Sequence, residues 1–296
     1  MTEDELVEAI RRLVERPDDR VFLGIGDDAA VWQPSRSHRS IITSDALIEN
    51  VHFRRENSGL AAIGRRAMAV NLSDIAAMGA RPILATVALG IPVETAEADA
   101  LALYQGIAEM GAAYGCTIAG GDLSRAPLIA IAITMVGEVR PSNLKTRAGA
   151  RPADVIAVTG PLGAARVSGY TAVPTPRIAE GRWLAASRSV HAMMDLSDGL
   201  STDLPRMCAR SKCGALVDRV PIAAGAGESD ALGGGEDYEL LAAISARAFT
   251  YIAKRFRRRF GRELERLGTF REGAGVFRKT GRGEQPLTAT GWDHFS

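Results

Sequence analysis

The sequence predicts an α/β (α+β) protein made of two domains. Segments with the apolar spacing of helices alternate with short segments rich in Val and Ile, and this alternation runs through both halves of the chain. A polar, basic stretch with two prolines, residues 139–154, separates the halves. Because 296 residues suffice for two cores, we expect domains at residues 1–140 and 141–296.

Composition excludes several classes of protein. The chain is 46% apolar and 24% charged, which is typical of globular proteins, and its net charge of +1 gives no sign of a nucleic-acid partner. No apolar run approaches the roughly 20 residues of a membrane span, and the acidic, amphipathic N-terminus lacks a signal-peptide core. The three cysteines form no CxxC pair. We therefore expect a cytoplasmic protein with no membrane or nucleic-acid partner.

The pattern of the first half predicts helices and buried strands in turn. We expect helices over residues 3–16, 58–79 and 94–114, and strands over 29–32, 40–45, 83–89, 116–119 and 128–136. The last of these is almost wholly apolar for nine residues, Leu128–Val136, which predicts an interior strand. The patterns place Asp45 at a strand end and Asp122 just past one.

The second half predicts the same kinds of element. We expect helices over 163–168, 177–189 and 246–262, and strands over 154–160, 215–220 and 264–270. Residues 192–200 are predicted to be a strand that runs into the start of a helix, which continues to about residue 209. A further apolar strand follows the glycine-rich segment 233–240, and a hairpin-like tail closes the chain. Asp198 and Ser201 are candidate N-caps of the helix that starts near Leu200.

A glycine-rich segment near the N-terminus imitates a dinucleotide-binding motif. Residues 24–29 fit GxGxxA, but that fingerprint needs a following helix whose N-terminus meets the pyrophosphate. Here the next residues, Ala29–Trp32, have the composition of a strand, and Asp27 and Asp28 would repel a pyrophosphate unless a cation lay between them. We reject the Rossmann interpretation.

Asp74 is the most unusual acidic residue. It lies near the end of an Ala-rich helix that ends at Gly79, and at helical spacing it shares a face with Ile63, Ala67 and Met78. We expect this helix, and its carboxylate, to be buried. A buried carboxylate is costly unless it is paired or bound to a metal ion.

Six further aspartates occupy similar settings, at strand ends, glycine turns or helix starts. They are Asp27, Asp28, Asp45, Asp122, Asp195 and Asp198. Each alone is also typical of a cap or a turn, but together they predict a cation site, since clustered carboxylates must bind cations or shift their pKa values. Oxygen ligands without His or Cys favour Mg²⁺, Ca²⁺ or Mn²⁺, and Mg²⁺ commonly accompanies phosphates. The usual phosphate loop GxxxxGK[ST] and the protein-kinase motifs are absent from the sequence.

Seven sequence blocks resemble the thiamine-monophosphate kinase family, within the superfamily of aminoimidazole ribonucleotide synthetase. They occur in the family's order and span nearly the whole chain: GIGDDAAV (24–31), TSDALIENVHF (43–53), AVNLSDIAAMGA (69–80), GGDLSRAP (120–127), DLSDGLSTDL (195–204), GGEDYEL (234–240) and GWDHF (291–295). The resemblance implies a two-domain PurM-like fold, with an N-terminal mixed sheet and helices that bind ATP and Mg²⁺ and form the dimer. A C-terminal α/β domain would complete the substrate site.

The resemblance also implies an activity and a set of site residues. The family transfers the γ-phosphate of ATP to thiamine monophosphate, uses several Mg²⁺ ions, and forms cytoplasmic homodimers in which the N-terminal sheets join. By motif, the metal ligands would be Asp28, Thr43, Ser44, Asp45, Asp74, Asp122, Asp195 and Asp198, with Asp74 and Asp198 as the catalytic residues. Contacts to ATP would come from Tyr104, Gly121, Asp122, Arg147 and Ser197. The thiamine substrate would face His52, Glu236 and Trp292.

The chemistry agrees with this assignment. The acceptor is a phosphate monoester whose second pKa is about 6, so it is anionic at neutral pH and needs no catalytic base. Thiamine carries a cationic ring, for which an aromatic face such as Trp292 and a carboxylate such as Glu236 are suitable neighbours. Each also has a purely structural interpretation: Trp292 as an anchor of the C-terminus, His52 as a turn residue beside Phe53.

Two segments depart from the family pattern, and two alternatives stay open. Residues 160–177 and 220–233 look shorter than in the family, which leaves the acceptor less certain than the ATP and Mg²⁺ residues. One alternative is another member of the superfamily with a different acceptor. The selenide and hydrogenase-maturation types are disfavoured, because the first cysteine is Cys116 and the chain ends His-Phe-Ser. The other alternative is a non-catalytic nucleotide-binding homologue.

Overall fold

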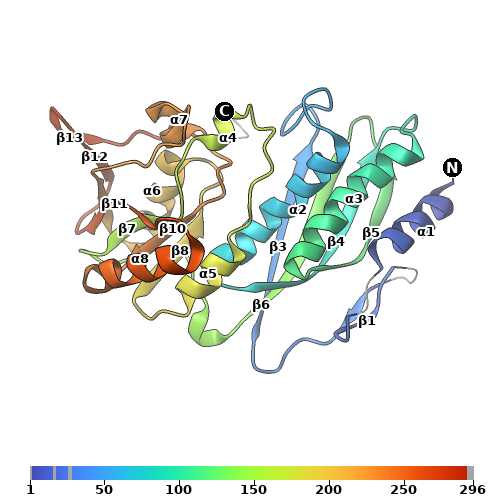
Figure 1. Cartoon of the computed structure of the whole chain (residues 1–296), viewed down its shortest axis with the longest axis horizontal. Helices are drawn as coiled ribbons and strands as arrows, with labels where there is room; N and C mark the ends of the chain where they lie inside the picture. Colours follow the sequence, from blue (N-terminus) through green and yellow to red (C-terminus); the bar gives the residue numbers. More distant parts are fainter. Residues whose placement is uncertain (1, 16–17, 26–28, 292–296) are drawn as a thin grey trace. The chain divides into compact units, whose positions relative to one another are not determined.

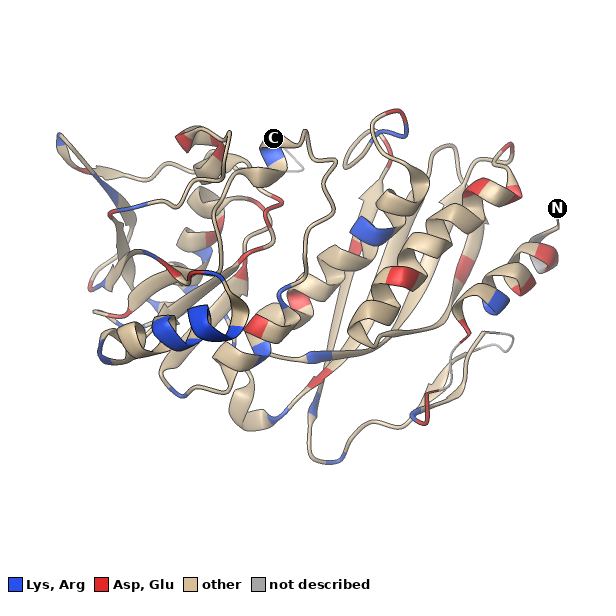
Figure 2. Ribbon diagram, viewed as in Figure 1, with Lys and Arg blue, Asp and Glu red and all other residues tan. Residues whose placement is uncertain are grey.

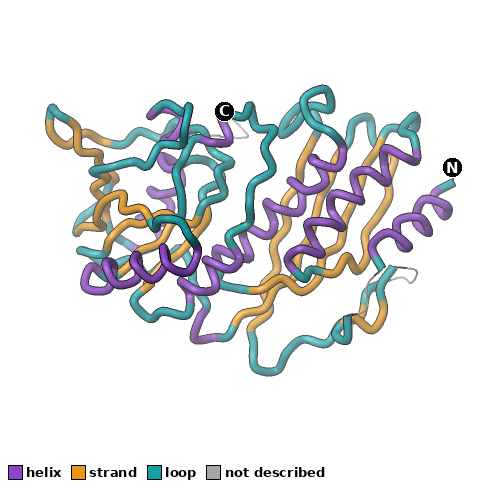
Figure 3. Tube along the Cα trace, in the orientation of Figure 1, coloured by secondary structure: helices purple, strands orange, loops and turns teal. Residues whose placement is uncertain are grey.

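The protein consists of two compact units, each with its own sheet and helices. The computed structural model describes residues 2–15, 18–25 and 29–291. Unit 1 comprises Met1–Ile75 and Ala80–Pro141, and unit 2 comprises Ala76–Gly79 and Ser142–Ser296. Helices and strands alternate in both units (Figures 1 and 3), which confirms the predicted fold class.

Unit 1 holds three long helices, a four-stranded sheet and a two-stranded hairpin. In chain order its elements are α1 (Glu3–Val14), β1 (Val21–Leu23), β2 (Val31–Trp32), β3 (Arg39–Ile48), α2 (Leu60–Ala77, whose last two residues belong to unit 2), β4 (Arg81–Ile91), α3 (Glu97–Tyr114), β5 (Thr117–Arg125) and β6 (Ala130–Val139). The predicted helices and strands are all found. Strands β3, β4, β5 and β6 are longer than predicted, β2 is shorter, and β1 was not predicted.

The sheet of unit 1 is mixed, with the order β3-β6-β4-β5. Its β6 pairs antiparallel with both β3 and β4, while β4 and β5 run parallel. The predicted interior strand is therefore confirmed, and β3 lies at an edge. In the middle of β4 and β6, Val87, Ile131 and Ile133 are buried, whereas Thr86, Ala88 and Thr134 on the other face are not. The two faces of the sheet thus have different surroundings.

Helices α2 and α3 lie side by side on one face of this sheet (Figure 1). They approach closely because each has a glycine at the contact. A Cβ atom on Gly64 would lie 2.0 Å from the Leu103 carbonyl oxygen, and one on Gly106 would lie 1.9 Å from that of Ala61. Only glycine allows backbones to approach this closely. The helix pair is largely apolar, and Met68, Leu72, Ile75, Leu103 and Ile107 are fully buried.

The β1–β2 hairpin packs on part of the other face. Val21 and Trp32 contact a small apolar cluster that includes Leu84 and Val136. A dinucleotide-binding site would need a helix directly after the GxGxxA motif, but strand β2 follows it instead. The rejection of a Rossmann site is therefore correct. The hairpin leaves β3 uncovered on that face, since Ile42 is 68% exposed.

Unit 2 holds a seven-stranded sheet with the order β13-β12-β9-β11-β7-β10-β8. In chain order its elements, after the short 3₁₀ turn Pro141–Asn143, are β7 (Val155–Val158), α4 (Ala164–Val167), α5 (Ile178–Ala185), β8 (Val190–Asp195), α6 (Leu200–Ser211), β9 (Gly214–Val217), α7 (Glu228–Gly233), β10 (Leu240–Ile244), α8 (Ala246–Phe260), β11 (Glu265–Arg271), β12 (Val276–Thr280) and β13 (Gly283–Pro286). The last two strands form the predicted hairpin. Helix α7 was not predicted, because its segment is short and rich in Gly and Ala.

The central strands of unit 2 are buried on both faces. Helix α6 contributes Leu204 and Met207 to a core shared with Val158 and Leu241. Helices α5 and α8 pack together through an aromatic cluster in which Trp183 lies 6.0 Å from Phe256, measured between ring centroids. The outer surface of α8 is strongly basic (Figure 2).

No helix within the described residues is both long and apolar enough to span a membrane.

Candidate functional site

Asp74 lies in α2 opposite the edge strand of the unit 1 sheet. Its carboxylate accepts a hydrogen bond from the Thr43 hydroxyl on β3. One turn away, the Asn71 side chain accepts the backbone N–H of Asp45 at 3.2 Å. The helix is buried as predicted, but Asp74 itself is partly exposed, which corrects the expectation of a buried carboxylate. The reason is its position over β3, where the sheet ends.

Ser44 points to the opposite face, because side chains alternate along a strand. Its hydroxyl lies 3.1 Å from that of Thr134 on β6, and Thr134 pairs with Thr86 on β4. In the next row Asp122 pairs with Ala88. Thr43 and Ser44 are therefore adjacent in sequence but belong to different faces of the sheet.

Asp45 and Asp122 lie inside strands, not at strand ends as predicted. Strand β3 continues to Ile48 and β5 continues to Arg125. Pairing with β6 and β4 extends both strands through residues that look like turn residues in sequence, among them Gly120 and Gly121. The Asp122 carboxylate accepts a hydrogen bond from Ser124 at 2.6 Å.

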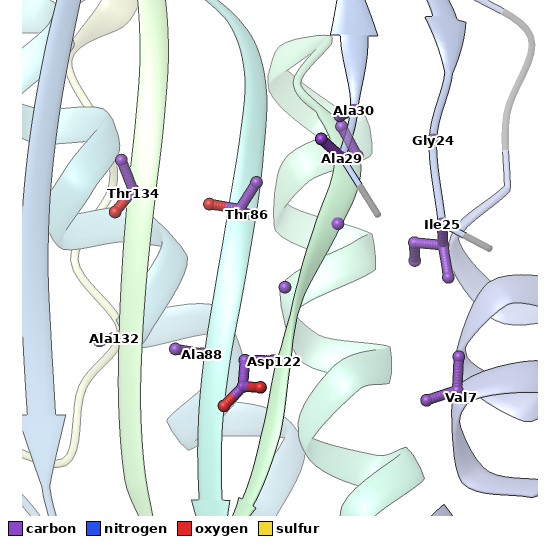
Figure 4. Close-up of a pocket in the computed structure, with 13 residues that line it drawn as sticks. Val7, Gly24, Ile25, Ala29, Ala30, Thr86, Ala88, Asp122, Ala132 and Thr134 are labelled. Atoms are coloured by element: carbon purple, nitrogen blue, oxygen red, sulfur yellow. The ribbon is translucent and has the colours of Figure 1, made fainter. Parts of the chain in front are cut away.

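A cavity of about 760 Å³ lies over this second face of the sheet (Figure 4). Small side chains create it, since the sheet contributes only Ala, Gly, Thr and one carboxylate. The lining residues are Val7, Gly24, Ile25, Ala29, Ala30, Thr86, Ala88, Ala119, Gly120, Gly121, Asp122, Ala132 and Thr134. Within the described part of the lining, Asp122 is the one charged side chain. An anionic ligand could bind beside it only if a cation accompanied that ligand.

Gly121 and Tyr104 occupy tight positions near Asp122. A Cβ atom on Gly121 would lie 1.9 Å from the Val87 carbonyl oxygen, so a larger residue would disturb the β4–β5 pairing. Tyr104, on α3, is only 3% exposed. Burial, together with the charge of Asp122, raises the pKa of its hydroxyl.

His52 lies in the turn that follows β3. Its Nδ1 accepts the backbone N–H of Ile48 at 3.0 Å, and its carbonyl oxygen accepts a hydrogen bond from Arg66 at 2.9 Å. Phe53 beside it is buried. These contacts match its interpretation as a turn residue, and they also hold the ring in a fixed orientation.

In unit 2, Asp195 ends β8 and Asp198 lies in the following turn. Asp195 is 3% exposed. The Asp198 carboxylate accepts a hydrogen bond from Arg206, whose Nη1 also donates to Asp203 at 2.8 Å. Burial raises the pKa of Asp203, although the N–H of Asp198 donates to its carboxylate.

The caps predicted for α6 are not found. Gly199, with φ of 100°, occupies the N-cap position. Ser201 instead accepts the backbone N–H of Thr290 at 3.1 Å, which fastens the C-terminal segment to α6. Gly291 follows so closely that a Cβ atom on it would lie 1.9 Å from the Asp198 carbonyl oxygen. Trp292 is the next residue along the chain.

Ser197 and Glu236 come from two loops that are joined by their backbones. The N–H of Glu236 donates to the Ser197 carbonyl oxygen at 2.6 Å, and that of Tyr238 donates to Leu196 at 2.9 Å. The structure thus brings Ser197, Asp198 and Glu236 into one region of unit 2. Arg147 is exposed, and its carbonyl oxygen accepts a hydrogen bond from Ser211.

The described residues contain no group of three or more His, Cys, Asp or Glu side chains that could hold a metal ion. The predicted residues Asp27, Asp28 and Trp292 lie outside the described residues. What the structure offers are carboxylate–hydroxyl pairs, Asp74 with Thr43 and Asp122 with Ser124. This donor set suits Mg²⁺, which is commonly bound by one or two carboxylates together with water and substrate phosphates.

Sequence reasoning missed several polar residues beside these sites. Glu239 is 5% exposed and binds Arg177, Arg262 and the Thr159 hydroxyl. Thr86 and Thr134 supply hydroxyls to the cavity. The sequence could have indicated all three residues. Glu239 comes directly before an apolar strand, and Thr86 and Thr134 each interrupt one.

Both halves of the chain match known domain families. Residues 26–139 match the N-terminal domain of AIR synthase related proteins, and residues 154–277 match the C-terminal domain. The fold therefore belongs to the AIR synthase related class, which confirms the predicted PurM-like architecture.

More specific similarities identify the family. A thiamine-monophosphate kinase from Rhodopirellula baltica is 40% identical over 247 residues, which cover 76% of this chain and 77% of the relative. The crystal structure of thiamine-monophosphate kinase from Stenotrophomonas maltophilia is 34% identical with a TM-score of 0.82, covering 94% and 96% of the two chains. The structure of AaThiL complexed with AMPPCP and TMP is 27% identical with a TM-score of 0.76, covering 99% and 97%. The chain belongs to the thiamine-monophosphate kinase family. The predicted resemblance, and with it the prediction of a kinase, is confirmed.

Proposed function

We infer that this protein transfers the γ-phosphoryl group of ATP directly to thiamine monophosphate, by an in-line displacement that yields thiamine diphosphate and ADP. The observation that carries the inference is the similarity to thiamine-monophosphate kinases over most of the chain. The complex of AaThiL with AMPPCP and TMP supports the choice of both substrates, because its fold is shared over 99% of this chain.

The chemistry of the acceptor explains why no catalytic base is required. The phosphate of thiamine monophosphate is largely deprotonated at neutral pH, because its second pKa is about 6. The task of the enzyme is therefore to hold two anions together in line. In unit 1, Thr43 would fix the orientation of the Asp74 carboxylate by its hydrogen bond, and Ser124 would do the same for Asp122.

We propose that Mg²⁺ is bound by the oxygen ligands predicted from the sequence. These are Asp28, Thr43, Ser44, Asp45, Asp74, Asp122, Asp195 and Asp198. When bound, Mg²⁺ would screen phosphate charge and align the transferred group. The cavity beside Asp122 supports this proposal, since its described lining offers phosphates no basic side chain.

The nucleotide and the acceptor would contact different sets of residues. The ATP contacts would be Tyr104, Gly121, Asp122, Arg147 and Ser197, and the acceptor contacts would be His52, Glu236 and Trp292. Glu236 would lie near the cationic ring of thiamine, where a carboxylate is favourable. In this proposal the first domain provides most of the contacts to ATP and Mg²⁺, and the second adds further contacts to both and completes the substrate site.

We also propose a cytoplasmic homodimer in which the first domains of two copies join through their sheets. Ile42 and Ile48 support it, because both are exposed on the uncovered face of the edge strand β3, at 68% and 39%. Exposed apolar residues on one side of an edge strand are typical of a protein interface.

The decisive experiment follows product formation. The purified protein would be incubated with ATP, Mg²⁺ and thiamine monophosphate, and thiamine diphosphate and ADP would be separated by chromatography. We expect both products in equal amounts and none when EDTA replaces Mg²⁺. ADP without thiamine diphosphate would indicate another acceptor, and a protein that fails to bind ATP would refute the kinase function altogether.

A further inference from the structure

Residues 163–177, here named the strap, are fastened to the loop 234–239 at three points. Near the start of the strap, the backbone N–H groups of Gly163 and Ala165 donate to the Asp237 carboxylate, at 2.7 and 3.2 Å. In the middle, the Tyr170 hydroxyl donates to the Gly234 carbonyl oxygen at 2.8 Å. At the end, Arg177 donates to both carboxylate oxygens of Glu239, at 2.9 and 2.6 Å.

The loop needs such support because its backbone is in an uncommon conformation. Gly235, Glu236 and Tyr238 have φ values of 67°, 57° and 50°. Residues other than glycine rarely adopt this left-handed backbone conformation. They keep it only where the surrounding structure holds them in place. On its other side the loop is held by the hydrogen bonds of Glu236 to Ser197 and of Tyr238 to Leu196. The loop therefore lies between the strap and the turn that contains Asp198.

The three anchors are not equivalent. Arg177 and Glu239 form a buried ion pair that Arg262 and Thr159 share, so its loss would weaken the fold of the whole unit. Tyr170 is partly exposed and contacts the loop through its hydroxyl group, which donates to Gly234. Its ring lies 5.7 Å from the Arg166 guanidinium, which also donates to its hydroxyl at 3.1 Å and lies 4.0 Å from Asp230 of α7.

We propose that Tyr170 is a positioning residue for Glu236, and that the strap determines how the enzyme binds the cationic acceptor. This rests on the proposed function, in which Glu236 faces the thiamine ring. Tyr170 fixes Gly234, two residues before Glu236, and so limits the directions in which the Glu236 carboxylate can point. Binding of the acceptor then depends on the strap more strongly than binding of ATP does, because the Tyr170 bond acts on the loop that carries Glu236.

The test compares Tyr170→Phe with a matched control, Tyr251→Phe. Tyr251 on α8 also receives a hydrogen bond from an arginine four residues away, at 2.8 Å, and also has that guanidinium near its ring. Among the described residues, Tyr251 forms no hydrogen bond with the loop 234–239. Both variants remove one hydroxyl group, so a general effect of losing a tyrosine hydroxyl appears in both.

We expect Tyr170→Phe to raise the KM for thiamine monophosphate about threefold to tenfold, the effect of one lost hydrogen bond. The KM for ATP, kcat and Tm should stay near wild type, and Tyr251→Phe should change nothing. An unchanged KM for thiamine monophosphate would overturn the proposal. So would an equal rise in both KM values, or a lower kcat with unchanged KM, because a merely structural role has those effects.

A double-mutant cycle tests whether Tyr170 acts through Glu236. In the background of Glu236→Gln, the added Tyr170→Phe substitution should change the KM for thiamine monophosphate by less than twofold. Independent, multiplying effects of the two substitutions would contradict the proposal. A wild-type protein that binds ATP but does not phosphorylate thiamine monophosphate would refute the proposed function. This outcome is distinguishable from a failure of the Tyr170 proposal, because it is measured on the wild-type protein before any variant is made.

Discussion

The hydroxyl of Thr43 on β3 donates a hydrogen bond to the carboxylate of Asp74 on α2. This contact joins the edge strand of the unit 1 sheet to the helix that covers it. It also sets the direction of the one carboxylate on α2. The neighbouring polar residues Asn71 and Ser73 are buried, whereas Asp74 is not. A carboxylate that is held in place but partly exposed can still accept a ligand.

We predict that Asp74→Asn abolishes turnover while the protein stays folded. The amide keeps the size of the side chain but removes the charge, so kcat should fall on the order of 100-fold or more. Loss of one charge-assisted hydrogen bond should cost about 2 kcal/mol of stability. Steady-state kinetics and thermal melting measure the two effects. Asp99→Asn, on the exposed start of α3, is the control, and wild-type kcat in Asp74→Asn would refute the assignment of Asp74.

The contact between α2 and α3 predicts a large effect of adding one methyl group. Gly106→Ala places its Cβ against the Ala61 carbonyl oxygen, where backbone and not a flexible side chain would have to move. We expect a loss of stability of about 3 kcal/mol, measured by urea denaturation. Gly59→Ala is the matched control, because a Cβ atom there would have no neighbour within 4 Å. If the two variants were equally stable, the close contact between α2 and α3 would not contribute to the free energy of unfolding.

The proposed dimer predicts that a charge on the uncovered face of β3 separates the subunits. Ile42→Arg should convert the protein to a monomer, because burying an unpaired guanidinium in an apolar interface is costly. Val93→Arg is the control, since Val93 is equally exposed, at 71% against 68%, but lies beyond the end of β4. Light scattering coupled to gel filtration gives the mass. A wild-type monomer, or a dimeric Ile42→Arg variant, would contradict the proposal.

Asp18 predicts a pH-dependent contribution to stability. The Arg20 guanidinium beside it lowers the pKa of this carboxyl from 3.8 to about 2, and Asp18 also accepts a hydrogen bond from Thr117 on β5 at 3.1 Å. Because the folded pKa is depressed, the stabilisation is present above about pH 4 and is lost as the pH falls towards 2. The Tm of Asp18→Asn should therefore lie below that of wild type at pH 7, and the difference should shrink below pH 4. Asp19→Asn, at an exposed neighbouring position, is the control for the loss of one carboxylate.

The three cysteines should be unreactive in the folded protein. Cys116, Cys208 and Cys213 are at most 5% exposed, and burial raises the pKa of the Cys116 and Cys208 thiols to about 12. Because the thiolate is the reactive form, iodoacetamide at pH 8 should leave all three unmodified and activity unchanged. Mass spectrometry measures the labelling, and denatured protein provides the control for complete modification. Rapid labelling of the native protein would contradict the burial of these side chains.

The sequence by itself determined the order and type of almost every element. Apolar spacing is a local property, so it was sufficient to find α1, α2 and α3, the interior position of β6 and the C-terminal hairpin. The resemblance of short motifs was sufficient for the family. The acidic and hydroxyl residues could be selected because they interrupt apolar segments, as Asp74 does in α2.

Only the tertiary structure decided where strands end, which face each residue occupies and which polar groups meet. Strand β5 runs through Gly120 and Gly121 because β4 pairs with it along its whole length, a contact between distant segments. Thr43 and Ser44 separate to opposite faces once β3 pairs with β6. The bonds of Tyr170 to Gly234 and of Arg177 to Glu239 join segments about 60 residues apart. Such contacts leave no periodic pattern in the sequence, because they depend on how the chain returns to itself and not on the spacing of neighbouring residues.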